Sequence, residues 1–323
     1  MGTNPYLSSE APAGARSSWI DPATLMRIKS LQVRAKAVME GFFSGLHRSP
    51  YHGFSVEFSE YRQYTPGDDP RYLDWKLYAR TDRYYIKRFE DETNLRCHLL
   101  VDLSRSMSFG SLSYTKADYA KTCAATLGYF LSTQRDGVGL LTFDQGANEF
   151  IPARHRPGHI QRIFAALDRA ESGETTRLAP PLEQVAQHVR RRSMVVLISD
   201  LLADVEGLEY QLGCLKTQGH EVLLLRVVDP AEETLDFDGP ALFRDLETGR
   251  ELYVDPVSAR SQYQRRFNEH LQRITTMCQS LGIELSTFNT QRPLELSLFD
   301  LLNFRMRQGR GVQRHSQTGK GAR

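Results

Sequence analysis

The sequence has no long apolar run and only four cysteines. No uninterrupted apolar stretch approaches the roughly 18 residues that a bilayer-spanning helix needs, and residues 1–20 lack the apolar core of a secretion signal. Cys97, Cys123, Cys214 and Cys278 are widely spaced and form no CxxC pair, so the common zinc and redox motifs are missing. We therefore expect a cytoplasmic protein without a membrane span, whose cysteines are buried thiols.

The signatures of several enzyme classes are also missing. Neither GxxxxGK followed by Ser or Thr nor GxGxxG after a predicted strand occurs, which argues against a phosphate-cradling nucleotide site. HExxH and GxSxG are absent as well, so the sequence offers no zinc-protease helix and no nucleophile elbow. These absences favour a binding protein over an enzyme.

The chain has 323 residues, enough for one large α/β domain with an appendage or for two domains of ordinary size. Its formal net charge of +2 is unevenly distributed, because from Arg305 onward there are six Lys or Arg residues and no acid. Residues 306–323 contain no aromatic side chain that could stack on a base. We expect this basic tail and the Ala/Gly/Ser-rich residues 1–20 to be disordered, with no nucleic-acid partner.

The sequence of residues 21–92 predicts an N-terminal helix followed by a small β-containing segment. Asp21 and Pro22 are typical of a helix start, and apolar residues recur at helical spacing from Leu25 to Phe42. "FSVEF" at 54–58 and "RYYIKRFEDE" at 83–92 have the alternation of strands, and a turn-rich stretch lies between them.

The pattern of residues 93–305 predicts an α/β domain in which strands and helices alternate. Uninterrupted Val, Leu and Ile runs of this kind are typical of parallel strands buried on both faces, so we predict an open, doubly wound, mostly parallel sheet. His98 lies inside the first of these runs and is expected in the core. The predicted strands are 95–101, 137–143, 193–199, 221–228 and 283–288, with an edge segment near 147–151. The predicted helices are 115–134, 158–170, 180–191, 205–218, 256–281 and 293–305, and a hairpin with its turn at Thr248-Gly249 precedes the longest one.

Small oxygen-bearing side chains gather where two of these strands end. "LLVDLSRSMSFG" places an oxygen at every second position after a strand, and "VVLISD" ends in a second aspartate. Ligands of open parallel sheets bind outside the carboxyl ends of the strands. Hydroxyl and carboxylate oxygens without His or Cys suit magnesium, manganese or calcium. The candidate metal ligands are Asp102, Ser104, Ser106, Asp200 and a threonine of "SGETTRL", either Thr175 or Thr176.

"DLSRS", the Thr of "TRL" and the Asp of "LISD" resemble the metal-ion-dependent adhesion site of von Willebrand factor type A domains, over about residues 95–290. The resemblance implies that Ser104, Ser106 and Thr176 bind the ion directly, whereas Asp102 and Asp200 act mainly through ordered waters. Thr176 is preferred because Thr-x-Leu is common there in that family, and Thr175 remains the alternative.

The preceding segment, "YHGFSVEFSEYRQYTPGDDPRYLDWKLYARTDRYYIKRFEDE", closely resembles the bacterial family known as domain of unknown function 58. Many relatives carry N-terminal membrane helices, which are not found in this sequence. The resemblance implies a protein-binding module that acts with a MoxR-type AAA+ ATPase in the chaperone-like remodelling or maturation of client proteins. A magnesium-type site would then bind protein partners and perform no catalysis.

Two alternatives stay open at this point. Asp and Ser after a strand are also favoured as helix caps, so DxSxS alone does not establish a metal site. The second alternative is a metal-dependent phosphohydrolase using Asp68, Asp69 and Asp102, although Gly67-Asp68-Asp69 is also typical of a β-turn. Phosphatases with an aspartyl nucleophile usually carry a second Asp two residues on, where this chain has Ser104.

Overall fold

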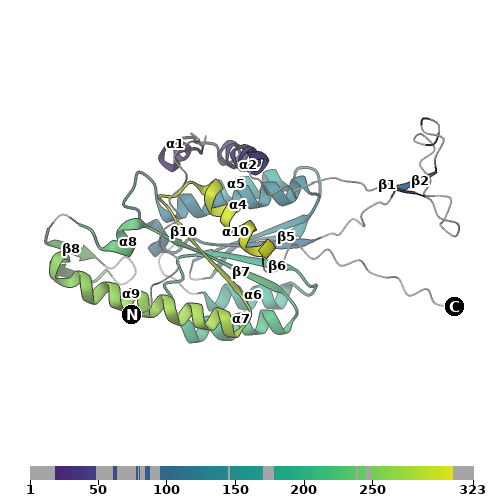
Figure 1. Cartoon of the computed structure of the whole chain (residues 1–323). Coiled ribbons are helices and arrows are strands. Elements are labelled where there is room, and N and C mark those ends of the chain that lie inside the picture. The colour runs from purple at the N-terminus through teal and green to yellow at the C-terminus, as the bar shows by residue number, and fades with distance from the viewer. Residues whose placement is uncertain are drawn as a thin grey trace.

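The protein is a three-layer α/β molecule, seen in a computed structural model (Figure 1). The structure describes residues 19–48, 61–63, 78, 80, 84–87, 95–144, 146–169, 178–237, 239–244 and 249–307. Within these residues, no helix is long and apolar enough to cross a membrane.

A six-stranded sheet forms the middle layer. Its strand order is β10-β7-β6-β3-β4-β5, and each described pair of neighbours is parallel except β4 and β5, which are antiparallel. The predicted open, mostly parallel sheet is confirmed, with the segment near 147–151 as its antiparallel edge. The strands are β3 (Arg96–Asp102), β4 (Gly137–Phe143), β5 (Ala147–Arg154), β6 (Met194–Ser199), β7 (Glu221–Val228) and β10 (Glu284–Asn289).

The central strands are apolar along their whole length because both faces of the sheet are covered. Every residue of β4 and β6 is buried. On β3, Leu99 and Val101 belong to one hydrophobic core, and Leu100 between them belongs to a second core on the opposite face. Because successive side chains of a strand point to opposite faces of the sheet, β3 contributes residues to both cores.

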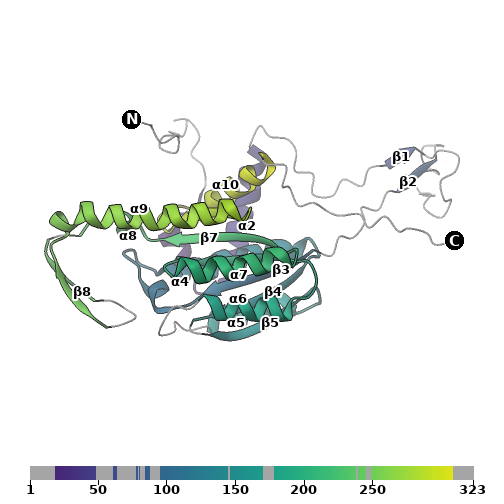
Figure 2. The ribbon, with the colours of Figure 1, turned by 90° about the horizontal axis from the view of Figure 1, so that it is seen from below.

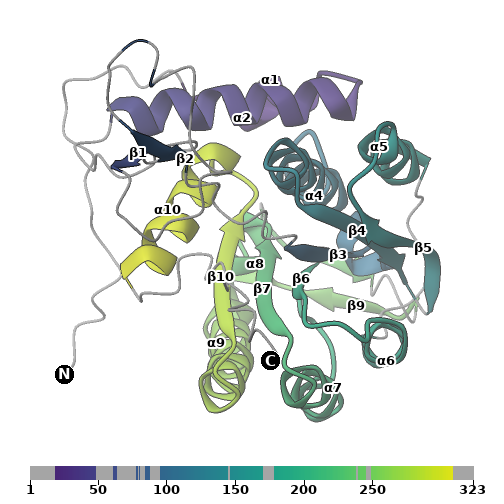
Figure 3. The ribbon, with the colours of Figure 1, turned by 90° about the vertical axis from the view of Figure 1, so that its right-hand side faces the viewer.

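Helices cover both faces of this sheet (Figure 3). One core is closed by α4 (Lys116–Thr133), α5 (His159–Arg169), α2 (Leu31–Arg48) and α10 (Leu294–Arg307). The other is closed by α6 (Ala179–His188), α7 (Val205–Thr217) and the long α9 (Pro256–Ser280). The helices begin and end within a few residues of the predicted ranges, as expected from the clear alternation of the sequence.

The N-terminal region contains two helices where the sequence predicted one. α1 (Pro22–Met26) begins at Asp21, whose carboxylate accepts a hydrogen bond from the Thr24 amide at 2.9 Å. The helix ends at Met26, and α2 starts at Leu31. The apolar spacing is nevertheless used as predicted, because Leu25 and Leu31 are both buried in the core with β3.

Six short elements complete the described fold. β1 (Tyr61–Gln63) and β2 (Tyr85–Lys87) form an antiparallel pair within the predicted β-containing segment, whereas the predicted strand at 54–58 lies outside the described residues. The predicted hairpin is present as β8 (Ala241–Arg244) and β9 (Glu251–Val254). The sequence did not predict η2 (Arg105–Ser108) or α8 (Pro230–Thr234).

Candidate metal centre at the carboxyl ends of the strands

Asp102 and Asp200 lie side by side at one edge of the sheet. Asp102 is the last residue of β3, and Asp200 directly follows β6. These strands are hydrogen-bonded neighbours in which Val101 pairs with Ile198. The two strands are thus neighbours, and both aspartates lie at the same end of the sheet.

The DxSxS segment folds into a turn that collects its oxygens. The Ser104 amide donates to Asp102 Oδ1 at 2.9 Å, and the Ser104 and Ser106 hydroxyl oxygens are 3.1 Å apart. Ser104 lies at the N-cap position of η2 but makes no capping hydrogen bond through its side chain. Helix capping therefore does not account for Ser104, and its hydroxyl faces Ser106 instead.

Asp102 is fully buried. Ser199, the last residue of β6, donates its hydroxyl to Asp102 Oδ2 at 2.5 Å. Burial, and then the nearby charge of Asp200, raise the pKa of Asp102 to about 7. A positive charge placed beside Asp102 would therefore favour its ionised form.

Asp200 is held in its ionised form. Burial alone would raise the pKa of Asp200, but the ammonium of Lys116 and hydrogen bonds from Lys116, Ser106 and the Leu202 amide lower it below its usual value. The Leu202 amide lies 3.1 Å from Asp200 Oδ1, and Lys116 Nζ lies 2.8 Å from Asp200 Oδ2. Ser106 thus connects the DxSxS turn to the second carboxylate.

The backbone after β6 is strained where it turns to serve this site. Leu201 has φ of +58°, a left-handed conformation that is costly for a residue with a branched side chain. In this conformation its amide donates to Ser199 Oγ at 3.0 Å, and its carbonyl contacts His270 Nε2 at 2.9 Å. These two contacts hold the segment after β6 in place, and one of them fixes the Ser199 hydroxyl that donates to Asp102.

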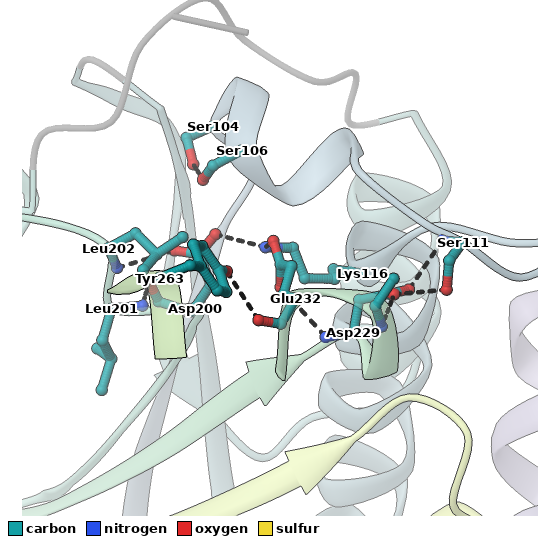
Figure 4. A network of polar contacts seen from close by, with 12 residues as sticks. Ser104, Ser106, Ser111, Lys116, Asp200, Leu201, Leu202, Asp229, Glu232 and Tyr263 are labelled. Atoms are coloured by element: carbon teal, nitrogen blue, oxygen red, sulfur yellow. Dashed lines mark hydrogen bonds and ion pairs between the residues drawn. The ribbon is translucent and has the colours of Figure 1, made fainter. Parts of the chain in front are cut away.

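Lys116 belongs to this cluster but was not predicted from the sequence (Figure 4). It opens α4, is fully buried, and pairs with Glu232 Oε1 at 2.5 Å as well as with Asp200. Burial lowers the pKa of a lysine, but the two carboxylates outweigh it and raise the pKa of Lys116 above its usual value. A lysine at a helix start gives no sign in the sequence of being buried.

Glu232 and Asp229 were missed as well, although a signal was available. Asp229 follows β7 as Asp102 ends β3, so the same strand-end rule applies to it. Its carboxylate accepts from the amide and hydroxyl of Ser111, at 2.9 and 2.5 Å, which ties the loop after η2 to β7. Asp229 and Glu232 form the capping box of α8.

Other predicted site residues lie outside the described residues. These are Thr175 and Thr176, the two candidates for the fifth ligand, and Asp68 and Asp69, the carboxylates of the phosphohydrolase alternative. His98 is buried as predicted and stacks on Phe150 with ring centroids 6.3 Å apart. Cys97, Cys123 and Cys278 are buried, whereas Cys214 is only half-buried.

The described oxygens fit a hard divalent cation. Ser104 Oγ and Ser106 Oγ share a hydrogen bond at 3.1 Å, a separation close to the roughly 3 Å between adjacent ligands of an octahedral magnesium shell. In the described part of the chain no three His, Cys, Asp or Glu side chains group as metal ligands, so an ion here would depend on hydroxyls and on two carboxylates. The Lys116 ammonium already supplies one positive charge beside Asp200, so the affinity of this cluster for a divalent cation would be modest.

Comparison with known proteins extends the similarity to most of the chain. The family described as "Protein of unknown function DUF58" matches residues 60–273. Uncharacterized protein Rv1480 of Mycobacterium tuberculosis is 29% identical over 306 residues, which cover 93% of this chain and 95% of the relative.

Solved structures with a related arrangement are more distant. BatB from Bacteroides thetaiotaomicron has 15% identity and a TM-score of 0.44, over 65% of this chain and 99% of that one. The SpRpn10 VWA domain has 12% identity and a TM-score of 0.39, over 64% and 94%. Structural similarity this low does not indicate what this chain binds. The family match, by contrast, spans well over half of the sequence, and the chain belongs to the DUF58 family of proteins of unknown function.

Proposed function

We propose that the strand-end cluster binds a divalent cation, magnesium first and manganese or calcium as alternatives, and through it a carboxylate of a protein partner. The observation that carries the proposal is the meeting of Ser104, Ser106 and Asp200 beside Asp102 at the ends of two neighbouring strands. Thr176 would complete the ligand set.

The chemistry of these ligands favours binding of an anion from outside. Ser104 and Ser106 are neutral, and Asp102 and Asp200 already accept hydrogen bonds within the protein. A cation held in this way is poorly neutralised, so when bound it would supply an electrophilic position for an external carboxylate. Ser106 is only half-buried, so the cluster reaches the surface on its side.

The same geometry favours a binding role over an enzymatic one. A nucleophilic carboxylate must reach its substrate, but Asp102 is fully buried and both of its oxygens accept hydrogen bonds, from Ser104 and Ser199. Asp102 therefore acts in this proposal by orienting the DxSxS turn and an ion-bound water. The protein itself catalyses no reaction.

We further propose a cytoplasmic MoxR-type AAA+ ATPase, and protein clients remodelled or matured together with it, as the partners. This part of the proposal comes from the resemblance to DUF58 proteins. The ATPase would supply the energy of remodelling, and the metal centre would supply a docking point for an acidic residue.

The test is the binding of the purified protein to a purified MoxR-type ATPase by biolayer interferometry, with excess magnesium and with EDTA. We expect binding with magnesium, and its loss in EDTA or with Asp102→Ala. The matched control is Asp168→Ala, at an exposed position of α5, which should bind like the unchanged protein. Equal binding under all conditions by variants that circular dichroism shows to be folded would contradict the proposal.

A further inference from the structure

A cavity of about 370 Å³ lies next to the candidate metal centre. It is open to solvent and is lined by η2 and the residue after it, the segment after β6, α8 and the loop after it, β8 and α9. The lining side chains that matter here are Ser106, Leu202, Leu235, Phe243, Arg244 and Tyr263. A volume of this size is in the range of small ligand sites and can enclose one large side chain.

The cavity and the metal centre share residues. Ser106 lines the cavity, and its hydroxyl is also 3.1 Å from that of Ser104. Leu202 lines the cavity too, and its amide donates to Asp200. If a carboxylate of a bound peptide reached the metal centre, a residue next to it in the peptide sequence would therefore lie beside the cavity.

The walls of the cavity are aromatic and firmly placed. Phe243 of β8 packs edge-on against Phe237, with ring centroids 5.1 Å apart. Tyr263 of α9 stacks on Phe267 at 5.8 Å and donates its hydroxyl to the Glu232 carbonyl at 2.7 Å. Rings held in this way offer apolar surface without a large cost in side-chain entropy.

The hairpin beside the cavity exposes apolar side chains on both of its faces. Leu252 pairs with Phe243 and is 66% exposed, and Tyr253 pairs with Leu242 and is 70% exposed. Figure 2 shows the hairpin at the margin of the molecule, beyond the sheet. Large exposed apolar side chains grouped beside a cavity are typical of surfaces that bind a protein partner.

The charge at the cavity suits an acidic partner. The one carboxylate of the lining, Glu232, is bound to the buried ammonium of Lys116 at 2.5 Å. Arg244, by contrast, is exposed on the hairpin. Arg244 lies opposite the exposed Glu251 in the hairpin register, so a cation bound at the neighbouring cluster would supply the net positive charge beside the cavity.

We propose that this cavity binds a large apolar side chain, preferably aromatic, of a partner segment whose acidic residue lies one or two positions away and docks at the metal centre. The proposal rests on the proposed function for the carboxylate, and on the cavity alone for the apolar side chain. It defines the recognised class as short extended acidic segments with a neighbouring aromatic residue.

The probe is the capped peptide Ac-Gly-Phe-Gly-Glu-Gly-Phe-Gly-NH2, in which a phenylalanine on either side shares one face of an extended chain with the glutamate. Its two matched controls replace both phenylalanines by alanine, or the glutamate by glutamine. Binding to the full chain is followed by amide chemical shifts in NMR titrations, with magnesium and with EDTA.

We expect the phenylalanine peptide to bind at least about tenfold more tightly than the alanine peptide, through burial of apolar surface. This preference should be lost with Phe243→Ala and reduced with Leu202→Ala, which leaves the hairpin intact. Tyr210→Ala, which removes an exposed aromatic residue on α7 outside the lining of the cavity, is the control and should leave the preference unchanged.

The outcomes separate the two proposals. A preference for phenylalanine that persists in EDTA and with the glutamine peptide supports the cavity and contradicts the metal-dependent docking of the carboxylate. Equal binding of the phenylalanine and alanine peptides, or a preference unchanged in Phe243→Ala and Leu202→Ala, overturns the assignment of the cavity.

Discussion

Lys116 Nζ lies 2.8 Å from Asp200 Oδ2, and both side chains are buried. The same ammonium pairs with Glu232, so one positive charge is shared by two carboxylates at the strand ends. The resting protein thus keeps Asp200 ionised without a metal ion. A divalent cation would add to this charge balance, and its affinity depends on how firmly Lys116 holds Asp200.

Replacing Lys116 by methionine should lower the free energy of unfolding by about 3–5 kcal/mol, because the buried Asp200 and the half-buried Glu232 lose their counterion. Excess magnesium should restore more stability to this variant than to the unchanged protein, since the ion can take over the missing charge. Urea denaturation with and without magnesium measures both effects.

Lys36→Met is the matched control, because Lys36 faces Glu40 at 3.9 Å in an exposed pair. We expect a change of at most about 1 kcal/mol there. Equal losses in the two variants would mean that the Lys116 ion pairs are not a main source of stability.

Much of the fold was predictable because its signals are local. The Val/Leu/Ile runs of β3, β4, β6 and β7 are long and uninterrupted, and burial on both faces requires such composition. The break between α1 and α2 was not predictable in this way, since Leu25 and Leu31 keep helical spacing on either side of it.

The site was predictable only in part. Asp102 and Asp200 follow from the strand-end rule, which would also have selected Asp229. The role of Lys116 depends on how α4 lies over the sheet and brings its first residue against β6. No spacing in the sequence encodes this contact, which joins residues 84 positions apart.

His98 should make stability depend on pH. Burial, with smaller contributions from His220 and Arg96, lowers the pKa of His98 from 6.5 to about 4, so the folded protein keeps it neutral where the unfolded chain takes up a proton. The part of the free energy of unfolding that depends on neutral His98 is fully present above pH 6.5 and is lost as the pH falls toward 4. At pH 5 the loss is about 2 kcal/mol. His98→Leu removes the titrating group, and its melting temperature should fall less than that of the unchanged protein between pH 7.5 and pH 5. Parallel pH profiles would contradict this assignment.

The N-terminal helix should be part of the domain core. Phe42 of α2 is 3% exposed and belongs to the same hydrophobic core as β3 and α4. Phe42→Ala should therefore cost about 3–5 kcal/mol in chemical denaturation. Val33 on the same helix is 51% exposed, and Val33→Ala should change stability by no more than about 0.5 kcal/mol. We expect Phe42→Ala to unfold in a single transition that lies at lower denaturant concentration than that of the unchanged protein. If α2 unfolded in a separate, earlier step, the shared core would be contradicted.

The fifth metal ligand can be assigned by a pair of neighbouring substitutions. Because Thr176 stands in the Thr-x-Leu pattern, Thr176→Ala should weaken magnesium binding, whereas Thr175→Ala should leave it unchanged. Manganese binding followed by water-proton relaxation measures both variants under one condition. The reverse result would assign the ligand to Thr175.

The central claim is that the strand-end cluster binds a divalent cation, and calorimetric titration with magnesium and manganese tests it most directly. The unchanged protein should bind one ion, and Ser104→Ala/Ser106→Ala should bind it at least about tenfold more weakly, because both hydroxyl ligands are lost. Ser258→Ala, at an exposed position of α9, should bind like the unchanged protein. Equal ion binding by the double variant and the unchanged protein, or no ion binding by either, would contradict the account.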